Sequence, residues 1–222
     1  MLAEDKIQIE KILRILRMHT KHMPMPAIDQ IVTHFGKNAY LILISCLLSL
    51  RAKDTVTIPV SFELFKLAQT PEALLRIPQS VLEKLLFPLG FYRKKAEILR
   101  EVSSELITRF QGKVPDTEEE LLSIKGVGRK TAAAVLGYAF AKSALCVDTH
   151  VHQIANRLGL VATKTPEQTE KELKIIVPHK DWIDLNRLLV MWGQNVCVPI
   201  SPFCSKCALT KMCPKIGVKR SR

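Results

Sequence analysis

The chain has 222 residues, of which 47% are hydrophobic and 24% charged, and its formal net charge at pH 7 is +12. This length can bury one large core or two modest ones, and the basic excess favours a polyanionic partner such as nucleic acid. Residues 1–11 alternate charged and apolar side chains, which excludes a secretory signal segment, and the longest apolar stretch, residues 39–50, is shorter than the about 20 residues that span a bilayer. We therefore expect an intracellular protein with no membrane segment.

The first half of the chain reads as a series of helices. A first amphipathic stripe ends before the proline-containing loop 23–26, and Asn38 can cap the apolar helix that follows it. Pro59 falls inside a helical pattern at residues 54–66, so this helix either starts later than Asp54 or is kinked. Further helices are expected after the proline-marked starts at residues 70–72 and 77–78, and a long one at residues 92–110. The first stripe consists of Ile9, Ile12, Leu13 and Leu16.

Two glycines separate a helix that begins after Thr117 from the next helix. Thr117 and Glu120 have the spacing of a capping box. Gly126 and Gly128 permit backbone conformations and a close approach that a side chain would block. The second helix then begins with unsatisfied N–H groups and a positive dipole end, which suit a phosphate. The segment is either a phosphate-binding hairpin for a DNA backbone or a plain helix–helix turn.

Lys130 lies in the first turn of this second helix, on the side opposite the buried stripe. An ordinary solvated lysine fits this position. A usable amine nucleophile fits it as well, because the helix N-terminus disfavours the ammonium form and burial against bound DNA would do so further. The stripe consists of Ala132, Val135, Leu136 and Ala139.

Asp148 directly precedes another helical stripe and is a good N-cap. Capping alone can explain it, but an ionised carboxylate at that place also suits the stabilisation of a cationic sugar. His150 and His152 invite a metal interpretation, yet two residues apart on a helix they point in different directions. A last capping box, Thr165 with Gln168, begins the next helix.

Four cysteines, Cys197, Cys204, Cys207 and Cys213, fall within seventeen residues that are interrupted by prolines. Four thiolates so close together can enclose a metal centre, and both zinc and iron–sulfur sites use this ligand set. Structural thiols or two disulfides are the alternative, although paired disulfides in one small loop belong mainly to secreted domains. The other two cysteines, Cys46 and Cys146, read as core residues. The basic tail, residues 215–222, is expected to be mobile.

These motifs, in this order and at this spacing, resemble the endonuclease III family of helix-hairpin-helix DNA glycosylases. The resemblance rests on residues 126–132, residues 147–150 and the cysteine loop 197–213. Residues 47–49 with 53–54, and residues 90–92 with 95–96, also resemble DNA-facing segments of that family. The likeness extends over roughly residues 25–214.

The resemblance implies an all-α fold of two domains. A six-helix barrel occupies residues 32–142 and contains the helix-hairpin-helix at about 117–141. Residues 1–31 and 143–222 form a second helical domain, in which Cys197, Cys204, Cys207 and Cys213 hold a [4Fe–4S] cluster. The cluster shapes a basic loop whose Lys206 and Lys211 either meet the DNA backbone or remain solvated surface charges.

The activity implied is base excision DNA repair by a bifunctional DNA glycosylase and AP lyase. Lys130 attacks the sugar of an oxidised or damaged pyrimidine flipped from double-stranded DNA, forms a Schiff base, and β-elimination nicks the strand. Asp148 stabilises the developing cation, and the hairpin (Gly126, Val127 and Gly128) holds a phosphate. The partner is then duplex DNA with a damaged base or an abasic site, and we expect a monomer in the cytoplasm, associated with the nucleoid.

Three positions depart from the family pattern. Arg51 stands where the family has a glutamine that fills the gap left by the flipped base, which leaves the lesion range and the opposite-base preference open. Phe91 is a further DNA-contact candidate. Lys125 replaces a hairpin proline and adds either a phosphate contact or a surface charge. Residues 140–147 lack the glycine and proline common before the catalytic aspartate, so that loop can be differently shaped.

Two other functions fit parts of the sequence. A monofunctional glycosylase acting on mismatched thymine, uracil or adenine is disfavoured by Lys130, since such enzymes typically lack a lysine there. A non-catalytic DNA-binding module held by a metal predicts binding without strand cleavage. A chain without the pair Lys130 and Asp148 would favour that module, and this chain has both residues.

Overall fold

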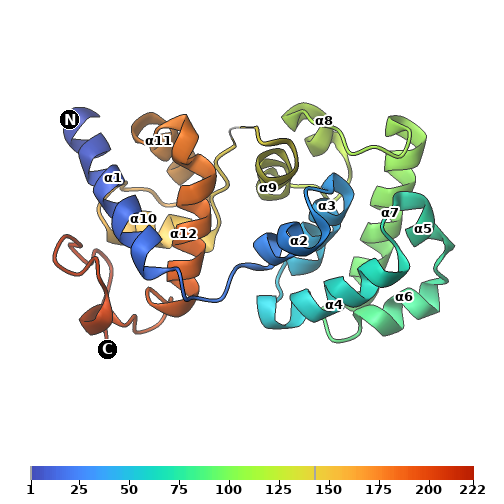
Figure 1. Cartoon of the computed structure of the whole chain (residues 1–222), viewed down its shortest axis with the longest axis horizontal. Coiled ribbons are helices and arrows are strands. Elements are labelled where there is room, and N and C mark those ends of the chain that lie inside the picture. The colour runs from blue at the N-terminus through green and yellow to red at the C-terminus, as the bar shows by residue number, and fades with distance from the viewer. Residues whose placement is uncertain (1, 143) are drawn as a thin grey trace. The chain divides into compact units, whose positions relative to one another are not determined.

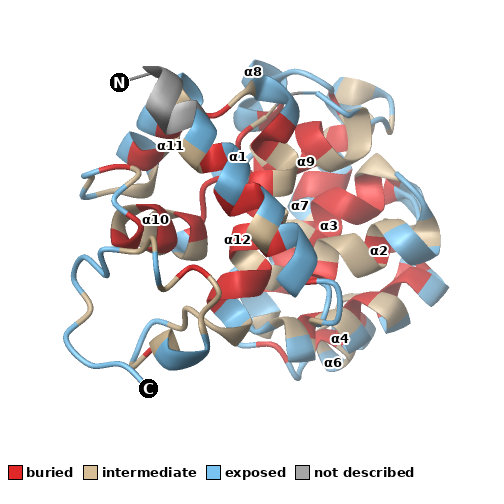
Figure 2. Ribbon diagram, turned by 60° about the vertical axis from the view of Figure 1, so that its left-hand side comes forward, coloured by how far each residue is buried: buried red, intermediate tan, exposed pale blue. Residues whose placement is uncertain are grey.

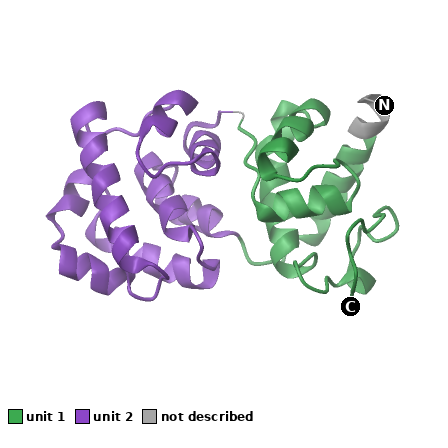
Figure 3. Ribbon diagram, turned by 180° about the vertical axis from the view of Figure 1, so that it is seen from behind, with its two compact units in different colours: residues 1–25, 143–222 green, residues 26–142 purple. Residues whose placement is uncertain are grey.

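The computed structural model describes residues 2–142 and 144–222, and within these residues there are twelve α-helices, two short 3₁₀ helices and no strand (Figure 1). The predicted all-α fold class is confirmed. The chain divides into two compact units: unit 1 comprises residues 1–25 and 143–222, and unit 2 comprises residues 26–142 (Figure 3). The boundary expected at residue 32 falls inside α2, Ala27–Phe35, and residue 143, at the second expected boundary, lies outside the described residues. In the described part of the chain, no helix has the length and apolarity required to cross a membrane.

Unit 2 is built around α3, Ala39–Ser49, which is buried along most of its length (Figure 2). A helix that is apolar all round belongs in a core, and each fully buried Leu or Ile contributes about 1.5–3 kcal/mol. The Asn38 side chain accepts hydrogen bonds from the N–H groups of Tyr40 (3.0 Å) and Leu41 (3.2 Å), as the expected cap requires. The helices that contact α3 are α2, α4 (Asp54–Leu67), α7 (Tyr92–Phe110) and α9 (Arg129–Phe140). The remaining helices of unit 2 are α5 (Pro71–Arg76), α6 (Gln79–Leu86) and α8 (Glu118–Ser123).

Helix α4 continues through Pro59. Its first turn is anchored at Lys53, whose carbonyl accepts from the N–H groups of Val56 and Thr57 (both 3.0 Å). A start later than Asp54 is therefore wrong, and Pro59 lies within the helix with its ring on the exposed side. Proline cannot donate the N–H that the carbonyl of Thr55, four residues earlier, would otherwise accept.

Unit 1 joins the two ends of the described chain. Helices α1 (Leu2–His19), α10 (Thr149–Arg157), α11 (Pro166–Ile176) and α12 (Trp182–Asn195) pack around one hydrophobic cluster, with 3₁₀ helices at His179–Asp181 and Cys204–Lys206. Arg17 of α1 donates to Asp184 of α12 (Nε to Oδ2, 2.6 Å) and to Asp181 (3.1 Å). The predicted stripe of α1 lies in the cluster, where Ile9, Ile12, Leu13 and Leu16 are buried.

Candidate active site and metal centre

The glycine hairpin of unit 2 joins α8 to α9. The hydroxyl of Thr117 accepts from the N–H of Glu120 (3.3 Å) and donates to the Glu120 carboxylate (2.7 Å), which confirms Thr117 as the N-cap of α8. Gly126 has φ +92°, a conformation that side chains rarely adopt, and a Cβ there would lie 3.2 Å from Ile98 Cγ2. Glycine at 126 is therefore required by the turn itself.

Gly128 has a different reason to be glycine. Its backbone is extended (φ −97°, ψ 173°), which any residue can adopt, and an added Cβ would meet nothing within 4 Å. Neither conformation nor packing within unit 2 explains the missing side chain. A glycine with open space above it is typical of a place where a ligand approaches the backbone closely.

The hairpin amides divide into two pairs. The N–H of Lys125 donates to Glu105 Oε2 (3.1 Å), and the N–H of Val127 donates to the carbonyl of Ile124 (3.0 Å). For the N–H groups of Gly126 and Gly128, the described residues provide no acceptor. Gly128 also gives α9 no side-chain cap, so the positive end of the helix dipole faces the same segment. The N–H groups of Gly126 and Gly128 are therefore the donors that a phosphate could use.

The Lys125 side chain is committed elsewhere. Its ammonium lies 3.2 Å from the carboxylate of Glu101 on α7, and the side chain is largely exposed. Lys125 was predicted to be either a phosphate contact or a surface charge, and its contact with Glu101 within unit 2 matches a surface charge.

Lys130 occupies the second position of α9 and is exposed. It lies close enough to α3 to influence Cys46: burial raises the pKa of the Cys46 thiol to about 12, and the Lys130 ammonium acts in the opposite direction. Near neutral pH Cys46 is thus a protonated thiol and no competing nucleophile. The exposed primary amine beside the hairpin is the group with nucleophilic potential.

The structure brings Arg51 and Phe91 together. Both have left-handed backbones, with φ 55° and 59°, and the guanidinium carbon of Arg51 lies 6.0 Å from the centre of the Phe91 ring. Both are exposed, Phe91 by 68%, which is unusual for so large an apolar side chain. Lys95, from a segment that the resemblance grouped as DNA-facing, is buried instead.

Asp148 belongs to unit 1, where it caps α10. Its Oδ1 accepts from the N–H groups of His150 and Val151 (both 2.9 Å), so the predicted N-cap is confirmed. The preceding segment is held by burial of Leu145 and Val147 and by Asn186 of α12, whose side-chain amide donates to the carbonyl of Cys146 (2.6 Å). For residues 140–147 the sequence left open whether the loop has a different shape, and residue 143 of this segment lies outside the described residues.

The two histidines after Asp148 have unrelated surroundings, as expected. His150 packs on Gly193 of α12, where a Cβ would come within 2.4 Å of its ring nitrogen. His152 Nδ1 is 2.6 Å from the Thr169 hydroxyl on α11. They do not form a common metal site.

The four predicted metal ligands line one cavity. Cys197, Cys204, Cys207 and Cys213 all face it, and Cys197, Cys207 and Cys213 pack against the hydrophobic cluster of unit 1. None of the four forms a disulfide in the structure, which does not favour the disulfide interpretation. In the described part of the chain, no group of three or more His, Cys, Asp or Glu is arranged to hold a metal ion.

Arg157, at the end of α10, holds the start of the cysteine loop. It is buried, and its guanidinium donates to Cys197 Sγ (3.3 Å) and to the carbonyls of Val198 (2.9 Å) and Pro199 (2.8 Å). Burial raises the pKa of the Cys197 thiol, and the hydrogen bond from Arg157 opposes that rise. Burial likewise raises the pKa of Cys213.

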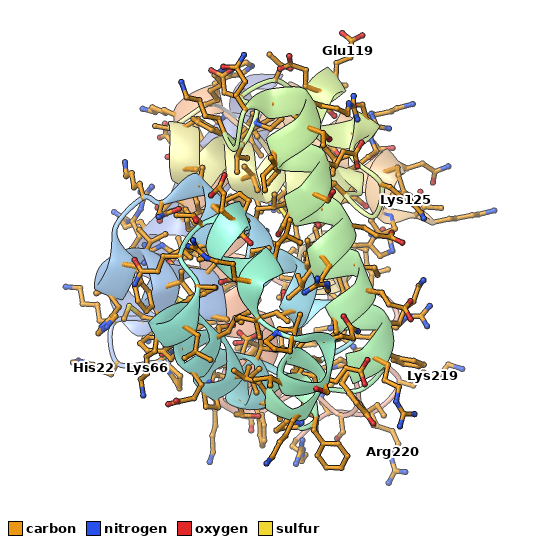
Figure 4. All side chains as sticks on the ribbon, turned by 90° about the vertical axis from the view of Figure 1, so that its right-hand side faces the viewer. His22, Lys66, Glu119, Lys125, Lys219 and Arg220 are labelled. Carbon is orange, nitrogen blue, oxygen red and sulfur yellow. The ribbon has the colours of Figure 1, made fainter. Side chains whose placement is uncertain are left out.

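The basic tail, which the sequence predicts to be mobile, instead folds back on the cysteine loop. The N–H of Arg222 donates to the carbonyl of Pro202 (2.8 Å), its carbonyl accepts from Ser205 (3.0 Å), and its guanidinium lies 4.0 Å from the centre of the Phe203 ring. Lys215 and Val218 form part of the cavity wall. Lys219 and Arg220 remain exposed (Figure 4), as do Lys206 and Lys211.

Sequence reasoning missed two buried cations, Lys95 and Arg157. Each lies on the buried face of its helix: Lys95 is four residues before Leu99, and Arg157 is three residues after Ile154. A charged residue within an apolar stripe is the signal that could have identified both, because a buried cation needs several acceptors.

Comparison with known proteins bears on the same residues. The sequence model of the HhH-GPD superfamily, described as base excision DNA repair protein, matches residues 44–179, a span that includes Lys130 and Asp148 but not the four cysteines. Endonuclease III of Thermotoga maritima is 43% identical over 189 residues, which cover 83% of this chain and 89% of that protein.

Solved structures that resemble nearly the whole chain include two of different function. A trapped covalent intermediate of endonuclease III with DNA matches with a TM-score of 0.80 and 29% identity, covering 95% of this chain and 96% of the other. A thermostable thymine-DNA glycosylase matches with the same TM-score and 26% identity, covering 96% of both chains.

Proposed function

The chain belongs to the HhH-GPD superfamily of base excision DNA repair proteins, and we propose that Lys130 is the nucleophile of its reaction. The chain is a DNA glycosylase with AP lyase activity of the endonuclease III type. The observation that carries the assignment of Lys130 is an exposed amine in the first turn of α9, directly behind a hairpin that keeps two N–H donors for a phosphate. A trapped covalent endonuclease III–DNA intermediate among the similar structures supports a covalent route.

The chemistry requires a neutral amine and an extruded nucleotide. Lys130 Nζ attacks C1′ of the deoxyribose and forms a C–N bond as the glycosidic bond breaks, and the departing base keeps the bonding electrons and takes up a proton. Opening of the sugar ring gives a protonated Schiff base. Loss of a C2′ proton then expels the 3′ phosphate, which cleaves the strand on the 3′ side, and hydrolysis returns the lysine. The proposed substrates are oxidised or damaged pyrimidines in duplex DNA.

Asp148 has the electrostatic role in this proposal. As the sugar loses its base, positive charge develops at C1′, and a fixed carboxylate stabilises it without reorganising. Two backbone N–H bonds at 2.9 Å orient Asp148, and the buried residues before it restrict its movement. It would also assist the proton transfers that follow.

The hairpin would position the DNA backbone beside the lesion. Its contribution is independent of sequence, because phosphate contacts orient a protein on DNA without reading bases. We assign the phosphate to the N–H groups of Gly126 and Gly128, next to the buried Val127, and we assign Arg51 and Phe91 to the disturbed base stack. One chain supplies all of these residues, so we propose that the enzyme acts as a monomer. Its proposed location is the cytoplasm, where it associates with the nucleoid.

For the metal centre we propose a [4Fe–4S] cluster on Cys197, Cys204, Cys207 and Cys213. A zinc ion would need all four sulfurs about 2.3 Å from one point, whereas a cluster binds each sulfur at a different iron around a larger core. The four cysteines around one cavity supply a ligand set that suits either group, and the similarity to endonuclease III favours the cluster. When bound, the cluster would cross-link the loop 197–213. Neither base removal nor β-elimination requires electron transfer from the cluster.

A second function has a specific observation in its favour. The similar thymine-DNA glycosylase matches as well in fold as endonuclease III does, so base removal without strand cleavage is the main alternative. The two functions differ in product: a glycosylase alone leaves an intact strand with an abasic site, and a lyase leaves a nick.

The product formed by wild type and Lys130→Gln tests the proposal. Labelled duplexes that contain an oxidised pyrimidine, or thymine opposite guanine, are incubated with each protein and resolved with and without alkali. We expect wild type to nick the oxidised-pyrimidine strand without alkali and Lys130→Gln to bind that duplex without nicking it. Strands that break only after alkali treatment would instead establish the monofunctional glycosylase.

A further inference from the structure

Lys95 is a buried cation with three backbone acceptors. It lies on α7 with 7% of its surface exposed, and its ammonium donates to the carbonyls of Leu47 (3.4 Å), Leu48 (2.9 Å) and Leu50 (2.6 Å). An ammonium has three protons to donate, so this arrangement satisfies it completely.

The three carbonyls belong to the end of α3 and the residue after it. The last carbonyls of a helix lack partners within the helix, and its C-terminus carries partial negative charge. Helices commonly close this end with a glycine, but α3 is followed by Leu50 and Arg51. Burial lowers the pKa of Lys95, so the carbonyls compensate for an unfavourable place for a charge. The lysine acts as the cap of α3 from another helix.

The same lysine connects two unusual backbone positions. Arg51 follows Leu50 directly, and Phe91 is the N-cap of the helix that carries Lys95, with its carbonyl accepting from the N–H of Lys95 (2.9 Å). Both residues have left-handed backbones although neither is glycine. Such conformations persist only where surrounding contacts impose them, and they are frequent at functional sites.

We propose that Lys95 is a positioning residue that holds Arg51 and Phe91 side by side as a wedge for the base stack of duplex DNA. This proposal rests on the proposed function and extends it to the step that precedes chemistry. An exposed aromatic ring can enter between base pairs, and a planar guanidinium can stack and donate to the base left without a partner. Lys95 itself touches no DNA in this account.

The wedge matters only where there is a base stack to open. Single-stranded DNA has no partner base and no duplex to disrupt, so its abasic site reaches Lys130 without the wedge. A positioning role therefore predicts a defect on duplex DNA that is larger than the defect on single-stranded DNA of the same sequence.

The test compares single-turnover nicking of an abasic site in a duplex and in the same single strand. For Lys95→Met we expect the duplex-to-single-strand rate ratio to fall by about ten-fold, the size of one lost base–aromatic stacking contact. The matched control is Lys94→Met, since Lys94 is the exposed neighbour whose ammonium pairs with Glu97 (3.0 Å), and this variant should keep the wild-type ratio. A fluorescent base opposite the abasic site should report unstacking with wild type and Lys94→Met, and not with Lys95→Met.

Further variants keep the test decisive if Lys95→Met does not fold. Arg51→Gly and Phe91→Ala leave the buried ammonium in place and should lower the same ratio by a similar factor. In a folded protein, Lys95→Met combined with Arg51→Gly should lower the ratio no further than either change alone.

Three results would overturn the proposal. The first is an equal loss of rate on duplex and single-stranded DNA, and the second is an unchanged rate ratio in Lys95→Met, Arg51→Gly and Phe91→Ala. The third is additive effects of Lys95→Met and Arg51→Gly in the double variant. Failure of wild type to nick either substrate would instead refute the proposed function.

Discussion

Asp148 combines two tasks in one carboxylate. Its Oδ1 accepts two backbone N–H bonds that begin α10, and we assign its charge to the cationic sugar. The two tasks separate chemically, because an asparagine oxygen caps a helix about as well as an aspartate oxygen but carries no charge.

Asp148→Asn should therefore fold normally and turn over slowly. We expect a melting temperature close to that of wild type and a loss of about 10²–10³-fold in single-turnover base excision, as is typical when a positioned electrostatic group is removed. Asp148→Ala, which lacks the cap as well, should also lower the melting temperature. Near-normal turnover of the asparagine variant would limit Asp148 to capping.

At this scale, sequence reasoning succeeded where the signal was local. The capping role of Asp148 followed from its place before an apolar stripe, and that of Thr117 followed from its spacing to Glu120. The burial of Lys95 and Arg157 was not predicted, because the carbonyls that accept their hydrogen bonds are far away in sequence. Leu48 is 47 residues from Lys95, and Pro199 is 42 residues from Arg157. No local pattern can indicate which carbonyls a buried cation will meet.

The hairpin between α8 and α9 shows how one element uses two glycines differently. Gly126 makes the turn, with φ +92° and Ile98 directly above it. Gly128 is not required by the backbone conformation, and a Cβ at this position would meet no other atom within 4 Å. If a phosphate occupies that space, a methyl group at position 128 should disturb binding but not folding.

Gly128→Ala should weaken binding to DNA of any sequence by about ten-fold, as loss of one phosphate contact would, while thermal unfolding stays close to wild type. Fluorescence anisotropy on undamaged and abasic duplexes measures both affinities. Gly126→Ala is the matched comparison and should be destabilised by about 1–2 kcal/mol through its left-handed backbone. Unchanged affinity of Gly128→Ala, or a defect confined to abasic DNA, would refute the phosphate assignment.

Helices were predictable where caps and apolar periodicity agreed. Residues 92–110 were expected as one helix, and α7 has these bounds. The tail 215–222 was expected to be mobile because it is a basic terminal segment. Its order comes from backbone bonds between Arg222 and residues 202 and 205, which composition does not reveal.

At the scale of the whole molecule, the N-terminal and C-terminal segments of the chain belong to one compact unit, unit 1. Arg17 bonds to Asp184 across 167 residues of sequence, and the cysteine loop packs on the same hydrophobic cluster. Apolar stripes indicated that each helix would be buried but not which helix would cover it. A metal centre in the loop would tie it to this cluster, because the free energy of binding becomes free energy of folding.

Cys204→Ser should therefore lose the visible absorbance of an iron–sulfur cluster and become sensitive to proteolysis within residues 197–213. Cys46→Ala, which removes a thiol from α3 outside the cavity, should keep both the absorbance and the protease resistance. Iron and sulfide analysis of the purified protein distinguishes the cluster from zinc. Full absorbance and unchanged resistance in Cys204→Ser would contradict the assigned ligand set.

The net charge of +12 gives the molecule a general attraction to DNA that weakens with salt, and it cannot identify a reaction. Catalysis as proposed depends on the amine of Lys130. Borohydride reduction of wild type on an abasic duplex, followed by digestion and mass spectrometry, tests this role most directly. We expect a sugar adduct on the peptide that contains Lys130 and none in Lys130→Gln. Absence of any adduct, or an adduct on a different lysine, would contradict it.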